Sequence, residues 1–241
     1  KLKMHNYCTL FDSNYLTRGL AMYESLKKYS DIFHLYMFAF DDKSYNLLKK
    51  LNLEFATVIS LKELEDKELL KIKDDRSAGE YCWTCTPSTI KYCIESYNLD
   101  ACTYLDADLY FFSNPAALIE EMGEKSVLIT EHRYTAQYEQ SDTSGVYCVQ
   151  FMTFKNDENG MKALNWWRDS CNEWCYARFE DGKFGDQKYL DDWTTRFEGI
   201  HVLKNLGGGV APWNIQQYDL LSNENFNLIF YHFHNYKILE N

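Results

Sequence analysis

The stretch "CTYLDADLYFF" (102–112) places two aspartates one residue apart in one of the most apolar parts of the chain. A carboxylate beside a buried strand costs free energy unless another group compensates its charge. In open α/β sheets, ligands bind beyond the carboxyl ends of the strands, and two hard oxygen ligands suit Mn²⁺ or Mg²⁺ bridging a diphosphate. The stretch therefore predicts a strand that ends at Asp106, and a metal site formed by Asp106 and Asp108.

Apolar segments alternate with amphipathic segments through the first half of the chain. The expected strands are 4–11, 32–40, 55–60 and 101–105, and the expected helices are 15–29, 41–51, 61–72 and 86–97, with another starting at 113–115. The helix at 86–97 is expected to start at Thr86, because Thr86-Pro87 combines an N-cap residue with a proline at the first helical position. This alternation predicts an α/β fold with a mostly parallel sheet and helices on both faces. No repeat or linker divides the chain, so we expect a single domain.

The composition excludes some partners. The formal net charge of −11 argues against a nucleic acid, because phosphate backbones require a basic surface. The apolar run "IFHLYMFAF" (32–40) has nine residues, whereas a membrane span needs about 20. The N-terminal residues "KLKMHNYC" (1–8) lack the apolar core of a signal peptide. We therefore expect a cytoplasmic protein without a transmembrane segment, for which peripheral contact with a membrane stays open.

The eight cysteines raise the question of zinc or redox chemistry. Cys82 and Cys85 have C-x-x-C spacing, and Cys171 and Cys175 lie one helical turn apart, so a four-thiolate zinc site is conceivable. The second pair lacks the tight spacing of a zinc knuckle, and the other four cysteines lie inside apolar segments. Buried, reduced thiols are therefore the preferred interpretation.

Four segments resemble, in order and approximate spacing, the GT-A nucleotide-sugar glycosyltransferases, especially the family 8-like retaining enzymes related to glycogenin and to bacterial lipopolysaccharide galactosyltransferases. They are "TLFDSNYLTRGLAMYESL" (9–26), "YLDADLYFFSNP" (104–115), "FGDQKYLD" (184–191) and "FYHFHNYK" (230–237). The resemblance covers nearly the whole chain. It implies one GT-A (Rossmann-like) domain over 1–241, with a nucleotide-binding half (1–110) and a sugar and acceptor half (111–241).

The resemblance also implies a role for individual residues. Asp106 and Asp108 would bind Mn²⁺ or Mg²⁺, and His232 would complete the protein ligands, with His234 as the reserve candidate. The expected donor-site residues are Thr9, Asp12 and Tyr15 in the nucleotide pocket, Lys91 facing the donor, Asp186 and Gln187 at the transferred sugar, and Lys237 at the diphosphate. Two simpler interpretations stay open: a structural histidine pair on one side of a strand, and a helix N-terminus at Asp186-Gln187.

The glycine-rich stretch "GGGVAPWN" (207–214) is a candidate acceptor site, because three glycines permit close backbone approach and Trp213 and Asn214 could meet a sugar. A plain surface loop is an equally good interpretation. Two positions depart from the family pattern. Asn235 stands where the family usually has glycine, and "YCVQF" (147–151) replaces an Asn-Ser/Ala-Gly turn near the donor.

The expected function is transfer of a hexose from a nucleotide sugar, UDP-glucose or UDP-galactose, to a saccharide or glycolipid acceptor. The resemblance implies retention of anomeric configuration and a place in cell-surface polysaccharide synthesis. One alternative is a haloacid-dehalogenase-type phosphatase, which also uses D-x-D after a strand and a later aspartate pair, such as Asp191-Asp192. Another is a non-catalytic sugar-nucleotide-binding protein on the same fold.

Overall fold

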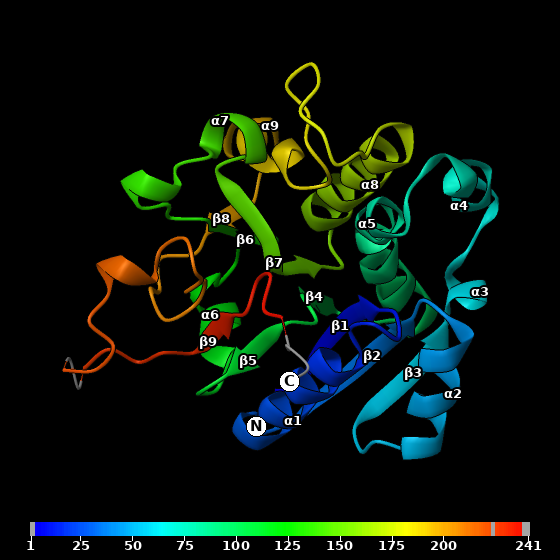
Figure 1. Cartoon of the computed structure of the whole chain (residues 1–241), viewed down its shortest axis with the longest axis horizontal. Coiled ribbons are helices and arrows are strands. Elements are labelled where there is room, and N and C mark those ends of the chain that lie inside the picture. Colours follow the sequence, from blue (N-terminus) through cyan, green and yellow to red (C-terminus); the bar gives the residue numbers. More distant parts are fainter. Residues whose placement is uncertain (1–2, 223–224, 238–241) are drawn as a thin grey trace.

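The computed structural model describes residues 3–222 and 225–237. One domain over 1–241, with halves 1–110 and 111–241, stays a prediction. A seven-stranded sheet has the strand order β3-β2-β1-β4-β7-β6-β8 (Figure 1). Its strands are β1 (His5–Phe11), β2 (Phe33–Ala39), β3 (Ala56–Ser60), β4 (Ala101–Leu105), β6 (Val127–Glu131), β7 (Tyr147–Lys155) and β8 (Ile200–Val202).

The sheet is mostly parallel, as predicted. Strands β3, β2, β1 and β4 pair in parallel, as do β6 and β8, whereas β7 is antiparallel to both β4 and β6. The four strands predicted in the first half agree with β1–β4 to within one residue at each end. Their continuous apolar runs are typical of strands that are buried on both faces of a sheet.

Helices cover both faces of the sheet, and each face has its own apolar core. Successive side chains of a strand point to opposite faces, so Cys8 and Leu10 belong to one core, and Tyr7 and Phe11 to the other. The core around Cys8 also contains residues of α5 (Ala78–Ser96) and α8 (Glu158–Glu173). The opposite core contains residues of α1 (Leu16–Tyr29), α2 (Asp42–Leu51) and α6 (Ala116–Glu121).

The start of α5 corrects the sequence prediction. The helix begins at Ala78, with Ser77 as N-cap in a capping box with Glu80, and Pro87 lies inside it. The Ser77-x-x-Glu80 pattern satisfies two backbone N–H groups at the helix start, and it outweighs the Thr86-Pro87 signal. The hydroxyl of Thr86 donates to the carbonyl of Cys82 within the helix instead of capping its start.

The helix predicted at 61–72 is divided into α3 (Leu61–Leu64) and α4 (Lys67–Ile72). Asp66 starts the second helix, because its carboxylate accepts hydrogen bonds from the backbone N–H groups of Glu68 and Leu69.

None of the helices in the described ranges has the length and apolar character needed to cross a bilayer.

A small second sheet brings the end of the chain to the aspartates. Strand β5 (Leu109–Phe111) pairs antiparallel with β9 (Phe230–His232), and Leu109 is the register partner of His232. In Figure 1, the red β9 lies beside the green β5, next to β4. The pairing therefore positions His232 directly next to Asp108.

Short elements complete the described chain. They are η1 (Lys73–Asp75), η2 (Ala136–Tyr138), α7 (Ser141–Ser144), η3 (Lys188–Asp192), α9 (Trp193–Arg196) and η4 (Ile215–Gln217).

All eight cysteines are free thiols, and seven of them are buried. Within the described residues, the four cysteines considered for zinc do not gather into a group of ligands, whereas Cys8, Cys93 and Cys102 meet in the core.

Candidate functional site

The two aspartates lie in the turn that follows the central strand β4. The backbone N–H of Asp106 donates to the carbonyl of Gln150 on β7 at 3.0 Å. Burial raises the pKa of Asp106 to about 6. Burial also acts to raise the pKa of Asp108, but the charge and hydrogen bond of His232 outweigh it and lower this pKa below its usual value. The two neighbouring carboxylates therefore differ in how readily they ionise.

His232 is the group that compensates the acidic pair. Its Nε2 lies 3.1 Å from Oδ1 of Asp108 and 3.6 Å from Oδ2 of Asp106. Burial acts to lower the pKa of His232, but the two aspartates raise it well above its usual value. The candidate ligand atoms of Asp108, His232 and His234 all lie within 4.8 Å of one another. The structure thus brings together the residues that the resemblance assigned to a metal.

Gln150 holds the other side of the His232 ring. Its side chain is fully buried, and its Oε1 lies 2.7 Å from Nδ1 of His232. Because an amide oxygen accepts hydrogen bonds, this contact places the proton on Nδ1, and a neutral ring presents the lone pair of Nε2 to the aspartates. Sequence reasoning missed this role. The only sign of this role in the sequence was that Gln150 is an amide in a largely apolar strand, inside the segment that departs from the family pattern.

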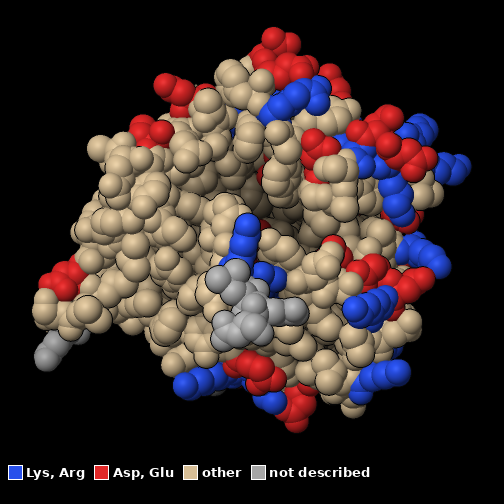
Figure 2. Space-filling model, viewed as in Figure 1, with Lys and Arg blue, Asp and Glu red and all other residues tan. Residues whose placement is uncertain are grey.

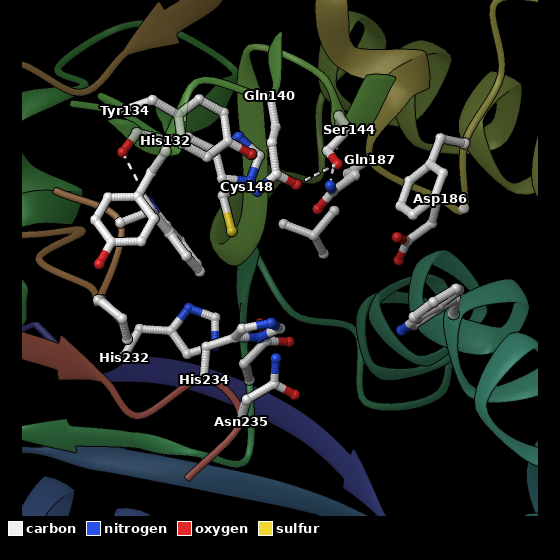
Figure 3. A pocket seen from close by; sticks show the side chains of 18 of the residues that line it. His132, Tyr134, Gln140, Ser144, Cys148, Asp186, Gln187, His232, His234 and Asn235 are labelled. Carbon is white, nitrogen blue, oxygen red and sulfur yellow. Dashed lines mark hydrogen bonds and ion pairs between the residues drawn. The ribbon is translucent and has the colours of Figure 1, made fainter. Parts of the chain in front are cut away.

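Two adjoining cavities meet at this group. One has a volume of about 590 Å³ and the other about 350 Å³. Asp106, His232 and His234 line both. Figure 2 shows a hollow in the middle of the corresponding face, and Figure 3 shows how side chains converge on it. The candidate metal ligands therefore lie where two binding spaces join.

The smaller cavity lies between the end of β1, the start of α1 and the N-terminal part of α5. Asp12 and Tyr15 line it, as expected for a nucleotide pocket. Thr9, on β1, is fully buried, and it is not among the residues that line the cavity. The Asp12 carboxylate accepts hydrogen bonds from the backbone and the side chain of Asn14, which fixes its orientation.

The two lysines assigned to the donor lie outside both cavities. Lys91 is on α5 and forms an ion pair with Glu95, one turn further along the helix. The expectation that Lys91 faces the donor is therefore not supported by its position. Lys237 is exposed just beyond β9. The backbone carbonyl of the preceding residue, Tyr236, accepts a hydrogen bond from Arg18 of α1 at 2.7 Å. Residue 236 therefore lies against the helix that borders the smaller cavity.

Asp186 and Gln187 line the larger cavity, at the side opposite His132 and Tyr134 (Figure 3). Asp186 is 6% exposed. Burial, followed by repulsion from Asp106, raises its pKa to about 8. The Gln187 side chain is oriented by its Nε2, which donates to the carbonyl of Ser144 at 2.7 Å. A carboxyl group in this setting is a candidate for direct contact with a bound substrate.

Trp213 and Asn214, the predicted acceptor residues, have different positions. Trp213 lines the larger cavity, and its indole N–H donates to the carbonyl of His132 at 2.9 Å. Asn214 is fully buried, and its amide is used inside the protein: it accepts from the N–H of Ala211 and donates to two carbonyls. The structure therefore contradicts the acceptor contact for Asn214, which instead shapes the loop that carries Trp213.

The glycine-rich stretch packs against the protein itself. A Cβ on Gly207 would lie 2.0 Å from the carbonyl oxygen of Asn227. The carbonyl of Gly207 accepts hydrogen bonds from the N–H groups of Ile229 and Phe230. Close backbone approach, predicted from the glycines, thus serves to seat the segment that leads into β9.

The departures from the family pattern have clear structural outcomes. Asn235 has a φ of 58°, a left-handed conformation that glycine adopts freely and asparagine tolerates. The segment 147–151 is regular strand within β7.

The aspartate pair considered for a phosphatase forms other contacts. Asp191 binds the N–H of Val146 and the side chain of Lys188, and the exposed Asp192 forms an ion pair with Arg196.

One face of α5 supplies cavity residues that sequence reasoning missed. Gly79, Cys82, Trp83 and Thr86 follow helical spacing, and all four line the smaller cavity. Gly79, Cys82 and Trp83 precede the predicted start of the helix at Thr86, so the shared direction of the four was not visible. Tyr104 also lines both cavities, and its position on β4, two residues before Asp106, could have indicated this.

Two curated proteins are similar in sequence to almost the whole chain. The chain is 32% identical to the uncharacterized protein YfnD of Bacillus subtilis, over 97% of this chain and 78% of YfnD. It is 30% identical to the uncharacterized protein YfnF of the same organism, over 97% of this chain and 82% of YfnF. No model of a known protein family matches the chain.

Two solved structures are similar over almost the whole chain. Mouse xyloside xylosyltransferase 1 superimposes with a TM-score of 0.59 at 14% identity, over 97% of this chain and 98% of that structure. The galactosyltransferase LgtC, solved with donor and acceptor sugar analogs, gives a TM-score of 0.59 at 12% identity, over 95% of this chain and 87% of that structure. These similarities confirm the predicted GT-A fold.

Proposed function

The chain belongs to the family of the Bacillus subtilis proteins YfnD and YfnF, and we propose that it is a family 8-like glycosyltransferase. It transfers a hexose from UDP-glucose or UDP-galactose to a saccharide or glycolipid acceptor, with retention, in cytoplasmic steps of cell-surface polysaccharide synthesis. One observation carries the proposal. Two aspartates and a histidine converge at the junction of two cavities, beyond the carboxyl end of the central strand.

The residues at the junction fit a divalent cation. Asp106 and Asp108 offer carboxylate oxygens, and His232 offers Nε2 in the tautomer fixed by Gln150. The atoms of Asp108, His232 and His234 are close enough to share one ion. This mixture of oxygen and imidazole ligands suits Mn²⁺, and carboxylates with phosphate oxygens suit Mg²⁺. When bound, the ion supplies Lewis-acid assistance and neutralises charge on the donor diphosphate.

The protein's own groups then act on the two ends of the donor. Asp12 and Tyr15 bind the nucleoside in the smaller cavity. Lys237, which is exposed beyond β9, approaches the diphosphate when the donor binds and offsets its charge. Asp186 faces the sugar in the larger cavity, where its carboxyl group, once deprotonated, stabilises positive charge that develops at the anomeric carbon. Gln187 orients the sugar from the same side.

The bonds change as follows. An acceptor hydroxyl oxygen bonds to the anomeric carbon while the bond from that carbon to the diphosphate oxygen breaks. The nucleoside diphosphate leaves with the bonding electrons, and the hydroxyl proton passes to its oxygen. Both cavities open to the junction, which supports contact between donor and acceptor there.

An NMR-monitored panel of UDP- and GDP-sugars with Mn²⁺ tests this proposal. We expect slow hydrolysis of UDP-glucose or UDP-galactose without acceptor, and no hydrolysis of p-nitrophenyl phosphate. Hydrolysis of the phosphoester with every sugar nucleotide inert would show the phosphatase alternative instead. Tight nucleotide binding without turnover of any donor would show a non-catalytic binding protein.

A further inference from the structure

The wall of the larger cavity opposite Asp186 is aromatic. Tyr134 and Tyr138, from the segment between β6 and β7, and Trp213, from the glycine-rich segment, line it. In Figure 3, Tyr134 and His132 lie across the cavity from Asp186. Planar, weakly polar surfaces of this kind bind the C–H-rich faces of sugar rings, which pack on the electron-rich face of an aromatic ring.

Contacts within the protein hold the rings of Tyr134 and Trp213 in place. The rings of His132 and Tyr134 stack, with centroids 4.6 Å apart and planes at 11°. Trp213 packs edge-on to His132 at 5.3 Å, and its indole N–H is bound to the His132 carbonyl. The carbonyl of Trp213 accepts hydrogen bonds from the N–H and the hydroxyl of Thr135, which ties the two segments together. A wall fixed in this way loses little entropy when a ligand binds.

The cavity lacks cationic side chains outside the candidate metal site. Among the described residues that line it, there is no lysine or arginine, and its two carboxyl groups, Asp106 and Asp186, gain negative charge as the pH rises through their raised pKa values. Burial lowers the pKa of His132 to about 4, so this imidazole is neutral near neutral pH, and His232 and His234 belong to the candidate metal site. To the left of the hollow, Figure 2 shows a mostly uncharged surface, with acidic side chains at its upper and lower edges. Outside the candidate metal site, none of the described lining residues would therefore compensate the charge of a phosphate or carboxylate.

Gln140, Ser144 and Gln187 supply neutral hydrogen-bonding groups between the aromatic wall and Asp186. A cavity of about 590 Å³ is within the range of roughly 300–1,000 Å³ that is usual for small-molecule sites. It therefore has room for the transferred sugar together with one acceptor sugar.

We propose that the aromatic wall binds a sugar unit of the acceptor that carries no formal charge, and that it rejects sugar phosphates and uronic acids at this position. This inference rests on the proposed function, since it assigns the acceptor of that reaction. The acceptor hydroxyl that attacks the anomeric carbon belongs to this uncharged sugar, and any charged or lipid part of a natural acceptor lies outside the cavity.

Matched sugars test the proposal. Methyl β-glucoside and methyl β-glucuronide differ only at C6, as a hydroxymethyl group and a carboxylate, and methyl β-galactoside and methyl β-galacturonide form a second pair. Saturation-transfer NMR measures their binding to the protein without donor. Donor consumption with UDP-glucose or UDP-galactose and Mn²⁺ measures their effect on turnover. We expect a neutral member to bind and to speed donor consumption at least about tenfold more than its anionic partner, a difference of about 1.4 kcal/mol.

Tyr138→Ala should weaken binding of the neutral sugar about tenfold, while the exposed Phe179→Ala, outside both cavities, should leave it unchanged. Tyr138 is itself 39% exposed, so its loss leaves the core intact. Stronger binding or faster turnover with the anionic partners, or no binding of any neutral sugar, would overturn the inference. Donor hydrolysis without acceptor tests the proposed function separately. If the donor is hydrolysed but no neutral sugar binds, only the acceptor inference fails; if no sugar nucleotide is hydrolysed, the proposed function fails.

Discussion

Replacing Asp186 by asparagine should stabilise the protein in the absence of metal and nucleotide. The carboxyl group is 6% exposed and lies near Asp106, and its pKa is raised from 3.8 to about 8. Between these two values, the unfolded chain has released the proton while the folded protein retains it. The folded state therefore binds more protons, and its stability falls as pH rises through this window. Asparagine has no carboxyl proton to lose and is close to aspartic acid in size and shape.

The size of the effect follows from the pKa values. At pH 7, about three pH units above the unfolded value, the cost of keeping Asp186 in the folded protein is about 4 kcal/mol, at 1.36 kcal/mol per unit. Water entry and local relaxation reduce this cost, so we expect a gain of about 2 kcal/mol for Asp186→Asn. For a chain of this size, that gain corresponds to a rise in Tm on the order of 5 °C.

Urea unfolding with a chelator present, from pH 4 to pH 8.5, measures the gain directly. The difference between Asp186→Asn and the wild type should be near zero at pH 4 and grow steadily towards pH 8. Asp192→Asn is the matched control, because Asp192 is exposed and pairs with Arg196 on the surface. The same Asp186→Asn protein should bind UDP within a few-fold of wild type but lose most transfer activity. A gain that does not depend on pH, or a loss of stability at pH 8, would refute the reasoning.

Three further predictions concern the candidate metal site. Asp108→Asn should weaken Mn²⁺ binding at least about tenfold, together with Mn²⁺-dependent UDP binding; calorimetry with and without a chelator checks this, and equal UDP binding in both would exclude a bridging ion. Gln150→Leu should weaken Mn²⁺ binding about tenfold through the loss of the His232 orientation, and imidazole ¹⁵N NMR should show a changed Nδ1 signal; an unchanged tautomer would contradict the role. Mn²⁺ affinity should fall as pH drops below the raised pKa of His232, because the ion requires neutral imidazole; His232→Ala should remove that dependence, and if His234→Ala removes it instead, His234 is the ligand.

The sequence predicted the elements whose signals are local. Strands buried on both faces and the amphipathic helix α1 are visible as short apolar patterns, and Asp106 and Asp108 stand out because they end such a pattern. The start of α5 was misplaced, because Thr86-Pro87 is a strong local signal while Ser77 and Glu80 decided the outcome. Competing signals of this kind are resolved by packing of the whole helix.

The assembly of the site depended on contacts that local patterns do not contain. Resemblance suggested His232 as a partner of the aspartates, but only the pairing of β5 with β9 shows how a residue so far along the chain reaches them. Gln150 and Trp213 acquire their roles from neighbours on other segments. Local patterns also did not show that Glu95 pairs with Lys91, or that carbonyls of the protein accept hydrogen bonds from the Asn214 amide.

The pairing of β5 with β9 makes the site sensitive to the order of synthesis and folding. β1 to β4 can form their sheet before β9 has been synthesised, but the imidazole reaches the aspartates only after β9 has docked. Until then, His232 cannot offset the charge of the two carboxylates. A divalent ion that binds across Asp108 and His232 would join β9 to the turn after β4 and so stabilise the docked state.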